Sequence, residues 1–271
     1  MFGKLLKHEL RHTARYHFAI LIISLVATVA MGVSLIFEAE NVLSMAMLPL
    51  VLIAVAVIIV SLVSVIKNFY ETIFSRQGYL TMTLPVKGSE LLISKVLISF
   101  FWIIVSYIAA FLPFVFIIAH VKKQLEIDNM TDELVQSLTA YLPSTGSIVT
   151  VVLFFVIGSL ISILSYVGYV YFSVTMANTR LLSKHPKLFG VLIFFGVHYV
   201  TDAITGVTEK IAPLSFAISD ERVFFTFKDI MEIEEFVYSL YSVNSYLVEA
   251  LVAIALLIVT GYFIEHKINI K

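Results

Sequence analysis

The chain has 271 residues, of which 60% are hydrophobic and 14% are charged, and its formal net charge is −1. Soluble domains carry about 25% charged residues, so this composition excludes an ordinary soluble globule. The absence of cysteine excludes disulfide bonds, thiolate catalysis and cysteine-based metal sites. Apolar runs recur at the length that a helix needs to cross the hydrocarbon core, without the alternation of an outer-membrane barrel. We therefore expect an all-α integral membrane protein.

Residues 1–16 are predicted to form an elbow helix that lies along the membrane surface. Apolar residues recur on one side of this helix, and the basic residues lie largely elsewhere, namely Lys4, Lys7, Arg11 and Arg15. This pattern is typical of interfacial helices. A cleaved signal peptide is the competing interpretation, but the apolar run continues past any plausible cleavage site. The elbow helix would lead directly into the first span.

Six apolar runs are predicted to cross the membrane. They are residues 17–37, 43–66, 96–119, 148–174, 188–206 and 246–264. If the N-terminus lies inside, the connections that face the cytosol hold most of the 18 Lys and Arg residues. The positive-inside rule then predicts that both termini are cytoplasmic. We expect a single transmembrane domain over residues 1–271.

The connection between the second and third spans, residues 67–95, is long for a link between bundled helices, which is usually about two to eight residues. It is predicted to hold a short helix with an apolar flank, a break, and a second helix that enters the third span. The residues of the flank and the break are Phe69, Tyr70, Ile73, Phe74, Arg76 and Gly78. One interpretation is a simple connector. The other is a docking element that receives force from a soluble partner.

The fourth span carries hydroxyl side chains spaced by three or four residues, which places them on one side of a helix. They are Ser159, Ser162, Ser165, Tyr166 and Tyr169. Ordinary helix packing is the favoured interpretation, because small and hydroxyl residues are common where membrane helices meet. The alternative is the lining of a transport pathway.

Ionisable residues also occur in the fifth and sixth spans. His198 and Asp202 are four residues apart and share a helix face, and Glu249 lies near the outer end of the last span. Ionisable groups at membrane depth are costly and indicate function by default. The single histidine and one carboxylate of the fifth span fall short of a full metal-ligand set, so we expect no metal site. We interpret the three residues as an outer polar site in contact with water.

The connection between the fifth and sixth spans, residues 207–245, is predicted to be extracellular and helical. Apolar residues recur there at helical spacing, opposite three glutamates, and they are Ile230, Ile233, Val237, Leu240 and Tyr241. This pattern predicts an amphipathic surface helix. The apolar run 211–218 is too short to cross the membrane, so we expect it to dip in and return.

The sequence of residues 68–95, NFYETIFSRQGYLTMTLPVKGSELLISK, resembles the cytosolic segment after the second span of ABC-2 type permeases, particularly of their bacterial peptide and antibiotic export branch. The residues that carry the resemblance are Phe69, Tyr70, 78–80, 83–85 and Lys95. Gln77 stands where members of that family often have an acidic residue. The expected spans, cytosolic ends and elbow helix are similar to that family as well.

The resemblance implies that residues 69–76 form a coupling helix, which would sit in a groove of a separate cytosolic ABC ATPase subunit. ATP and magnesium would bind to that subunit, because this sequence contains no phosphate-binding loop of the Walker type. We therefore expect no cofactor and no catalytic residue on this chain. A second permease copy or a paralogue would complete a dimer, and a nucleic acid partner is not expected.

The resemblance further implies export of an amphipathic peptide or a lipophilic antibiotic-like cargo across the bacterial plasma membrane, a function connected with antibiotic resistance. Two alternatives belong to other classes. A gradient-driven secondary transporter would favour interrupted helices and related halves, and neither is evident in the sequence. An intramembrane enzyme that uses His198 and Asp202 would need more polar partners than the spans offer.

Overall fold

The computed structural model describes residues 2–36, 42–75, 78, 87–124, 145–180, 182–219, 222–227 and 237–266. These residues are predominantly helical, as the sequence predicts. They divide into two compact units. Unit 1 comprises Met1–Asp128, Asn178–Leu181 and Gly261–Lys271, and unit 2 comprises Asn129–Ala177 and Leu182–Thr260.

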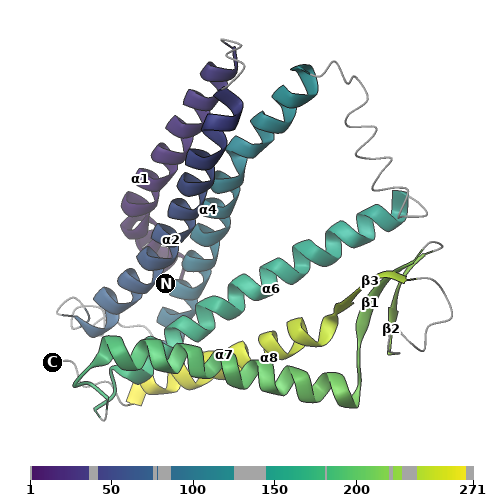
Figure 1. The fold of residues 1–271 in the computed structure, drawn as a ribbon. Coiled ribbons are helices and arrows are strands. Elements are labelled where there is room, and N and C mark those ends of the chain that lie inside the picture. The colour runs from purple at the N-terminus through teal and green to yellow at the C-terminus, as the bar shows by residue number, and fades with distance from the viewer. Residues whose placement is uncertain are drawn as a thin grey trace. The chain divides into compact units, whose positions relative to one another are not determined.

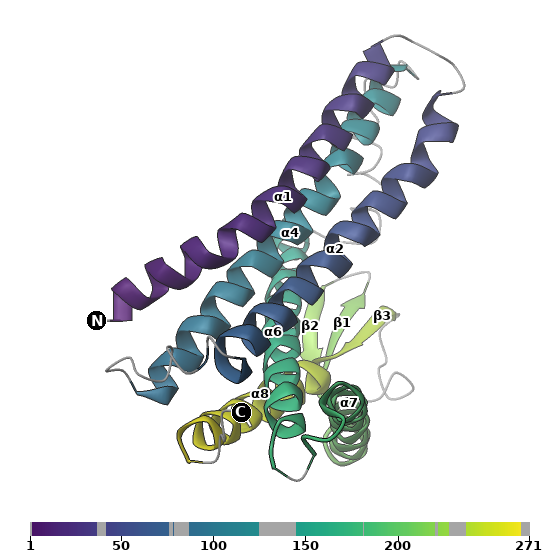
Figure 2. The ribbon, with the colours of Figure 1, turned by 90° about the vertical axis from the view of Figure 1, so that its left-hand side faces the viewer.

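Unit 1 is built from three helices that lie side by side (Figures 1 and 2). They are α1 (Phe2–Ile36), α2 (Val42–Phe74) and α4 (Gly88–Gln124), and each contacts the other two. Ile20, Val57 and Ala110 form a small buried cluster. Many other Leu, Ile and Val side chains of these helices are exposed, which suits helices whose outer faces meet lipid rather than water.

The last turns of α8 (Val243–His266) also belong to unit 1. Oε1 of Glu265 accepts a hydrogen bond from the backbone N–H of Ser89 at 3.1 Å. This bond satisfies one of the backbone donors that the first turn of α4 leaves without a helical partner. The C-terminal end of α8 therefore meets the N-terminal end of α4.

Unit 2 contains α6 (Thr145–Ala177), α7 (Pro186–Ile211), most of α8 and a small antiparallel sheet. The strands are β1 (Ser215–Ser219), β2 (Val223–Thr226) and β3 (Val237–Ser242), in the order β2-β1-β3. Phe216 of the central strand pairs with Phe225 and Tyr241. Its ring stacks on Phe154 of α6, with the ring centroids 4.3 Å apart, so the sheet packs against the first half of α6.

Five helices of the described part of the chain are long and apolar enough to cross a membrane. These are Pro49–Phe74, Gly88–Val115, Ser147–Ala177, Pro186–Ile211 and Val243–His266. Helix α1 adds a sixth if its two parts, Phe2–Arg15 and His17–Ala30, count as one bent span. The predicted helical structure is thus confirmed, and its five long apolar helices suit a multi-pass membrane protein, while the elbow helix and the exact number of six spans stay predictions.

The prediction of a helical connection between the last two spans is wrong for residues 215–219, 223–226 and 237–242, which form strands. Helix α7 continues to Ile211, and strands follow. Val237, Leu240 and Tyr241 of the expected amphipathic helix lie in β3, whereas Ile230 and Ile233 lie outside the described residues. The physical reason is tertiary, because pairing with β1 and packing on α6 override a helical periodicity that is short and local.

The run 211–218 likewise differs from the expected re-entrant loop. Its second half lies in β1, where neighbouring strands on both sides hydrogen-bond with its backbone. Phe216 and Ala217 are completely buried. An apolar run too short to span a membrane is therefore used here as the central strand of a small sheet, and its backbone polar groups are satisfied in that way.

Candidate functional site

The expected coupling residues lie at the C-terminal end of α2. The helix continues to Phe74 without interruption, so residues 69–74 form its last turns and not a separate short helix. No glycine or proline precedes Gly78 in this segment, which explains why the helix does not break earlier. A Cβ atom on Gly78 would lie 2.2 Å from the carbonyl oxygen of Ile73, so only glycine fits at this position beside the end of α2.

Burial divides the coupling residues into two sets. Phe69 and Ile73 are 0% exposed and pack inside unit 1, so they are not available as direct contacts for a partner protein. Tyr70 is 40% exposed, and its ring stacks on the half-buried Phe74 with a centroid distance of 6.2 Å. Arg76, the last residue of the expected coupling helix, lies outside the described residues. A docking role of this helix end therefore rests on Tyr70 and Phe74.

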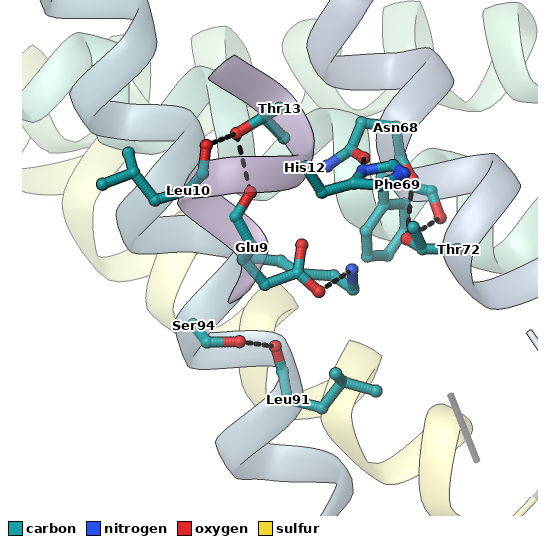
Figure 3. Close-up of polar contacts among 10 residues, drawn as sticks. Glu9, Leu10, His12, Thr13, Asn68, Phe69, Thr72, Leu91 and Ser94 are labelled. Atoms are coloured by element: carbon teal, nitrogen blue, oxygen red, sulfur yellow. Dashed lines mark hydrogen bonds and ion pairs between the residues drawn. The ribbon is translucent and has the colours of Figure 1, made fainter. Parts of the chain in front are cut away.

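A buried ion pair lies close to the same helix end, and the sequence analysis does not predict it. Nζ of Lys95 in α4 donates to Oε1 of Glu9 in α1 at 2.7 Å, and Figure 3 shows the Glu9 side chain. The two residues are 1% and 5% exposed. Two features of the sequence could have indicated the ion pair. Glu9 is an acidic residue on the apolar side of the first helix, and Lys95 is a lysine at the start of an apolar run. Neither one by itself indicates its partner.

Further polar contacts continue along the seam between α1 and α4. Nε1 of Trp102 donates to Oγ1 of Thr13 at 2.8 Å, and the indole ring stacks on His17 with a centroid distance of 4.6 Å. Glu9, Thr13 and His17 follow one another at intervals of four residues, which places them on one face of α1. Oε2 of Glu9 and Nε2 of His17 have no hydrogen-bond partner among the described residues.

Helix α1 also contacts the end of α2. Nδ1 of His12 and Oδ1 of Asn68 are 3.1 Å apart, and Oγ1 of Thr72 donates to the carbonyl oxygen of Asn68 at 2.6 Å. Figure 3 shows these side chains on facing helices beside Glu9. Asn68 begins the segment 68–95 and Lys95 ends it. The start of α1 therefore contacts both ends of that segment.

In unit 2, the structure brings together residues that the sequence analysis assigns to two separate groups. Oγ of Ser162 in α6 donates to Oε2 of Glu249 in α8 at 2.8 Å. The hydroxyl of Tyr169 lies 3.4 Å from the carbonyl oxygen of Glu249, and its ring meets the edge of His198 in α7 at a centroid distance of 5.1 Å. We call Ser162, Tyr169, His198 and Glu249 the Glu249 cluster.

The other residues of those two groups differ in their surroundings. Ser159 is exposed and donates to the carbonyl oxygen of Val156 in its own helix. Ser165 is buried, whereas Tyr166 packs against Phe194 with a centroid distance of 5.7 Å. Of the three expected outer polar residues, His198 and Glu249 thus belong to the cluster, whereas Asp202 follows His198 by four residues on α7 and is exposed.

Within the described residues, no group of three or more His, Asp and Glu side chains could hold a metal ion. No family model, no curated protein and no solved structure matches the chain. The chemistry of the two polar regions must therefore be inferred from their geometry.

The two regions have different capacities. The seam in unit 1 is closed by its own ion pair, so it suits a structural or force-transmitting role better than ligand binding. The Glu249 cluster presents a carboxylate, two hydroxyl groups and aromatic rings, which is a combination suited to binding a polar ligand.

Proposed function

We propose that the chain is the permease subunit of an ATP-driven exporter of the ABC-2 type in the bacterial plasma membrane. It would move an amphipathic peptide or a lipophilic antibiotic-like cargo out of the cell, while a separate cytosolic ATPase subunit binds ATP and magnesium and hydrolyses the ATP. The chain itself would not be an enzyme. A second copy or a related permease would complete the pathway. The apolar helices and the resemblance of residues 68–95 support this proposal.

The observation that carries the proposal is the double attachment of α1 to the segment 68–95. His12 contacts Asn68 at one end of the segment, and Glu9 pairs with Lys95 at the other. A connector that only joins two spans needs no such attachment. Removing two charges from water costs several kcal/mol per ion, so a buried pair at this position is expected where a fixed geometry matters.

Force applied to this segment would then reach the whole of unit 1. The segment leaves α2 and enters α4, and its ends are attached to α1, so all three helices would move together. Separation of Lys95 from Glu9 would leave two buried charges without partners, which opposes sliding of α4 along α1. Such a rigid group suits the rocking motions by which packed domains switch between two states.

The exposed end of α2 offers a surface for the ATPase subunit. Tyr70 and Phe74 supply adjacent aromatic rings, and Lys67 and Glu71 form an exposed ion pair beside them, with Nζ and Oε1 3.7 Å apart. An aromatic anchor with a charged rim is typical of protein interfaces. We call these four residues the Tyr70 surface.

The test is purification of the tagged chain from membranes of its native host, followed by identification of partners by mass spectrometry and by ATP hydrolysis. We expect an ATPase subunit to co-purify with the wild-type chain. Tyr70→Glu places a charge in the centre of the Tyr70 surface and should abolish co-purification. Phe227→Glu makes the same kind of change at a residue that is 68% exposed in unit 2, on the side predicted to be extracellular, and should leave it unchanged.

Two outcomes contradict the proposal. One is the absence of any ATPase from the wild-type preparation although the chain is folded. The other is equal loss of the partner in both variants, because a non-specific effect of the added charge would then explain the result. Phe69→Glu is unsuitable for this test, since Phe69 is completely buried and an unpaired charge there would unfold the helix end.

A further inference from the structure

The carboxylate of Glu249 has an unusual position for a charged group. It lies in α8, within the candidate span Val243–His266, and is half-buried. The described residues contain two ion pairs, Lys67–Glu71 and Lys95–Glu9, and Glu249 takes part in neither. Its Oε2 accepts a hydrogen bond from the neutral hydroxyl of Ser162. A carboxylate within a candidate span that pairs with no cation among the described residues is costly and indicates a functional site.

A continuous series of aromatic rings begins at the backbone of Glu249. Tyr169 reaches the backbone of Glu249 and meets His198. His198 in turn meets Phe194 at a centroid distance of 4.7 Å, and Phe194 meets Tyr166. Rings of this kind attract cations through their negative faces. The surroundings of Glu249 therefore suit a cationic group that is attached to an apolar chain.

Ser165 supplies a second, independent indication of a missing partner. It follows Ser162 by three residues and precedes Tyr169 by four, so the three lie on the same face of α6. Ser165 is 2% exposed, and its Oγ has no hydrogen-bond partner among the described residues. A buried hydroxyl without a partner costs about 1–3 kcal/mol. A ligand with several hydrogen-bond donors would remove this cost.

We propose that the Glu249 cluster, together with Ser165, binds an alkylammonium group. An ammonium has three donors and no acceptor, which matches a carboxylate and a hydroxyl that both have acceptor capacity left. The Glu249 carboxylate neutralises its charge, Ser165 accepts one hydrogen bond, and the aromatic series contacts the adjoining carbons. The amine of a peptide cargo and the headgroup of phosphatidylethanolamine share this chemistry.

This inference deepens the proposed export function, because it names the chemical group by which cargo would be held, but binding itself does not require the ATPase. The purified full chain in maltoside detergent is dialysed to equilibrium against radiolabelled octylammonium, with octanol as the neutral probe of equal chain length. We expect saturable binding of octylammonium and no saturable binding of octanol. Saturable binding of both probes with equal affinity overturns the proposal, since the charge would then be irrelevant.

Matched variants locate the site. Glu249→Gln keeps an oxygen that accepts the Ser162 hydrogen bond but removes the charge, so the affinity for octylammonium should fall at least about tenfold, as expected for a lost charge pair of a few kcal/mol. Glu209→Gln removes another acid of the same unit, whose carboxylate accepts a hydrogen bond from Ser242 of β3, and should change the affinity less than about twofold because this carboxylate is engaged outside the cluster. Unchanged binding in Glu249→Gln, or an equal loss in Glu209→Gln, overturns the proposal.

A further variant is chosen so that a loss of binding is not explained by misfolding. Ser165→Ala deletes a hydroxyl that has no partner, so the fold should be retained, yet the affinity should fall about threefold through loss of one acceptor. Wild-type affinity in Ser165→Ala excludes Ser165 from the site and overturns its assignment. Loss of ATPase co-purification in a chain that still binds octylammonium contradicts the export function alone. Loss of octylammonium binding in a chain that retains the ATPase contradicts only the binding site.

Two competitors distinguish the sources of the ammonium group. Competition by an amphipathic Leu/Lys peptide, but not by short-chain phosphatidylethanolamine, assigns the site to cargo. Competition by the phospholipid, but not by the peptide, assigns it to a lipid headgroup. Failure of both to displace octylammonium shows that the site accepts neither source and overturns the proposal.

Discussion

Lys95 and Glu9 form an ion pair between α4 and α1, with Nζ and Oε1 2.7 Å apart and both side chains almost completely buried. The two residues are separated by 86 positions in the sequence. The pair lies near the contact of His12 with Asn68, so the beginning of α1, the end of α2 and the beginning of α4 meet at one end of unit 1. The stability of this junction depends on the ion pair, because each of these two buried charges is neutralised by the other and not by water.

Removal of one charge of the pair should therefore lower the free energy of unfolding more than removal of both charges. We expect Glu9→Gln and Lys95→Met each to lower the free energy of unfolding by about 3–5 kcal/mol, as for other broken buried pairs. The double variant Glu9→Gln/Lys95→Met should be clearly more stable than either single variant. Denaturant unfolding of the detergent-solubilised chain measures these differences. Additive losses in the double variant would show that the two charges do not compensate each other.

Thr13 is expected to stabilise the same seam as the acceptor for Trp102. Thr13→Val leaves the buried indole N–H without its partner and should cost about 1–3 kcal/mol. Thr28→Val is the matched control, because Thr28 is buried too but donates only to Ser24 within its own helix. Trp102 is the only tryptophan, so its fluorescence should change in Thr13→Val and stay constant in Thr28→Val. Equal stability losses in both variants would contradict a specific role of the indole bond.

Gly158 should be required for the contact between α6 and α8. A Cβ atom there would lie 2.6 Å from Cζ of Tyr246, so Gly158→Ala should destabilise the chain by about 1–3 kcal/mol through overpacking. Gly196 in α7 has nothing within 4 Å of such an atom, and Gly196→Ala should be neutral or stabilising by up to about 1 kcal/mol. Thermal unfolding of both variants provides the comparison. A neutral Gly158→Ala would mean that the Tyr246 ring moves aside freely.

Introduced cysteines should reveal the orientation without background, because the chain contains none. Lys4→Cys and Lys67→Cys should react with a membrane-impermeant maleimide only after the cells are permeabilised, whereas Arg222→Cys should react in intact cells. All three positions are exposed. Reaction of Lys4→Cys in intact cells, with Lys67→Cys still protected, would show that α1 does not cross the membrane and that the chain has five spans.

Two contacts join the ends of the first and last helices to the start of α4. The positive-inside rule predicts that residues 1–16, residues 67–95 and the C-terminus lie on the same side of the membrane. In the structure, Glu9 contacts Lys95, and Glu265 contacts Ser89. The first and last helices thus each have one end beside the start of α4.

The coupling residues illustrate the limit of prediction from a periodic pattern. Phe69, Tyr70, Ile73 and Phe74 are all apolar or aromatic and close in sequence, so each one suits a docking surface equally well. Burial of Phe69 and Ile73 beside exposed Tyr70 depends on where the neighbouring helices lie. In this sequence, the helix face that packs inside the protein and the face that is exposed for a partner protein have the same kinds of residues.

The amino-acid sequence by itself determined that this is a helical membrane protein with long apolar runs, because the length and polarity of a segment are local properties that a bilayer selects directly. Only the tertiary structure decided that Glu9 pairs with Lys95, that Ser162 and Tyr169 join Glu249, and that the last connection contains a sheet. Each of these depends on contacts between residues far apart in the chain. The free energy of these contacts arises from burial and hydrogen bonding between two segments, so neither segment by itself predicts them.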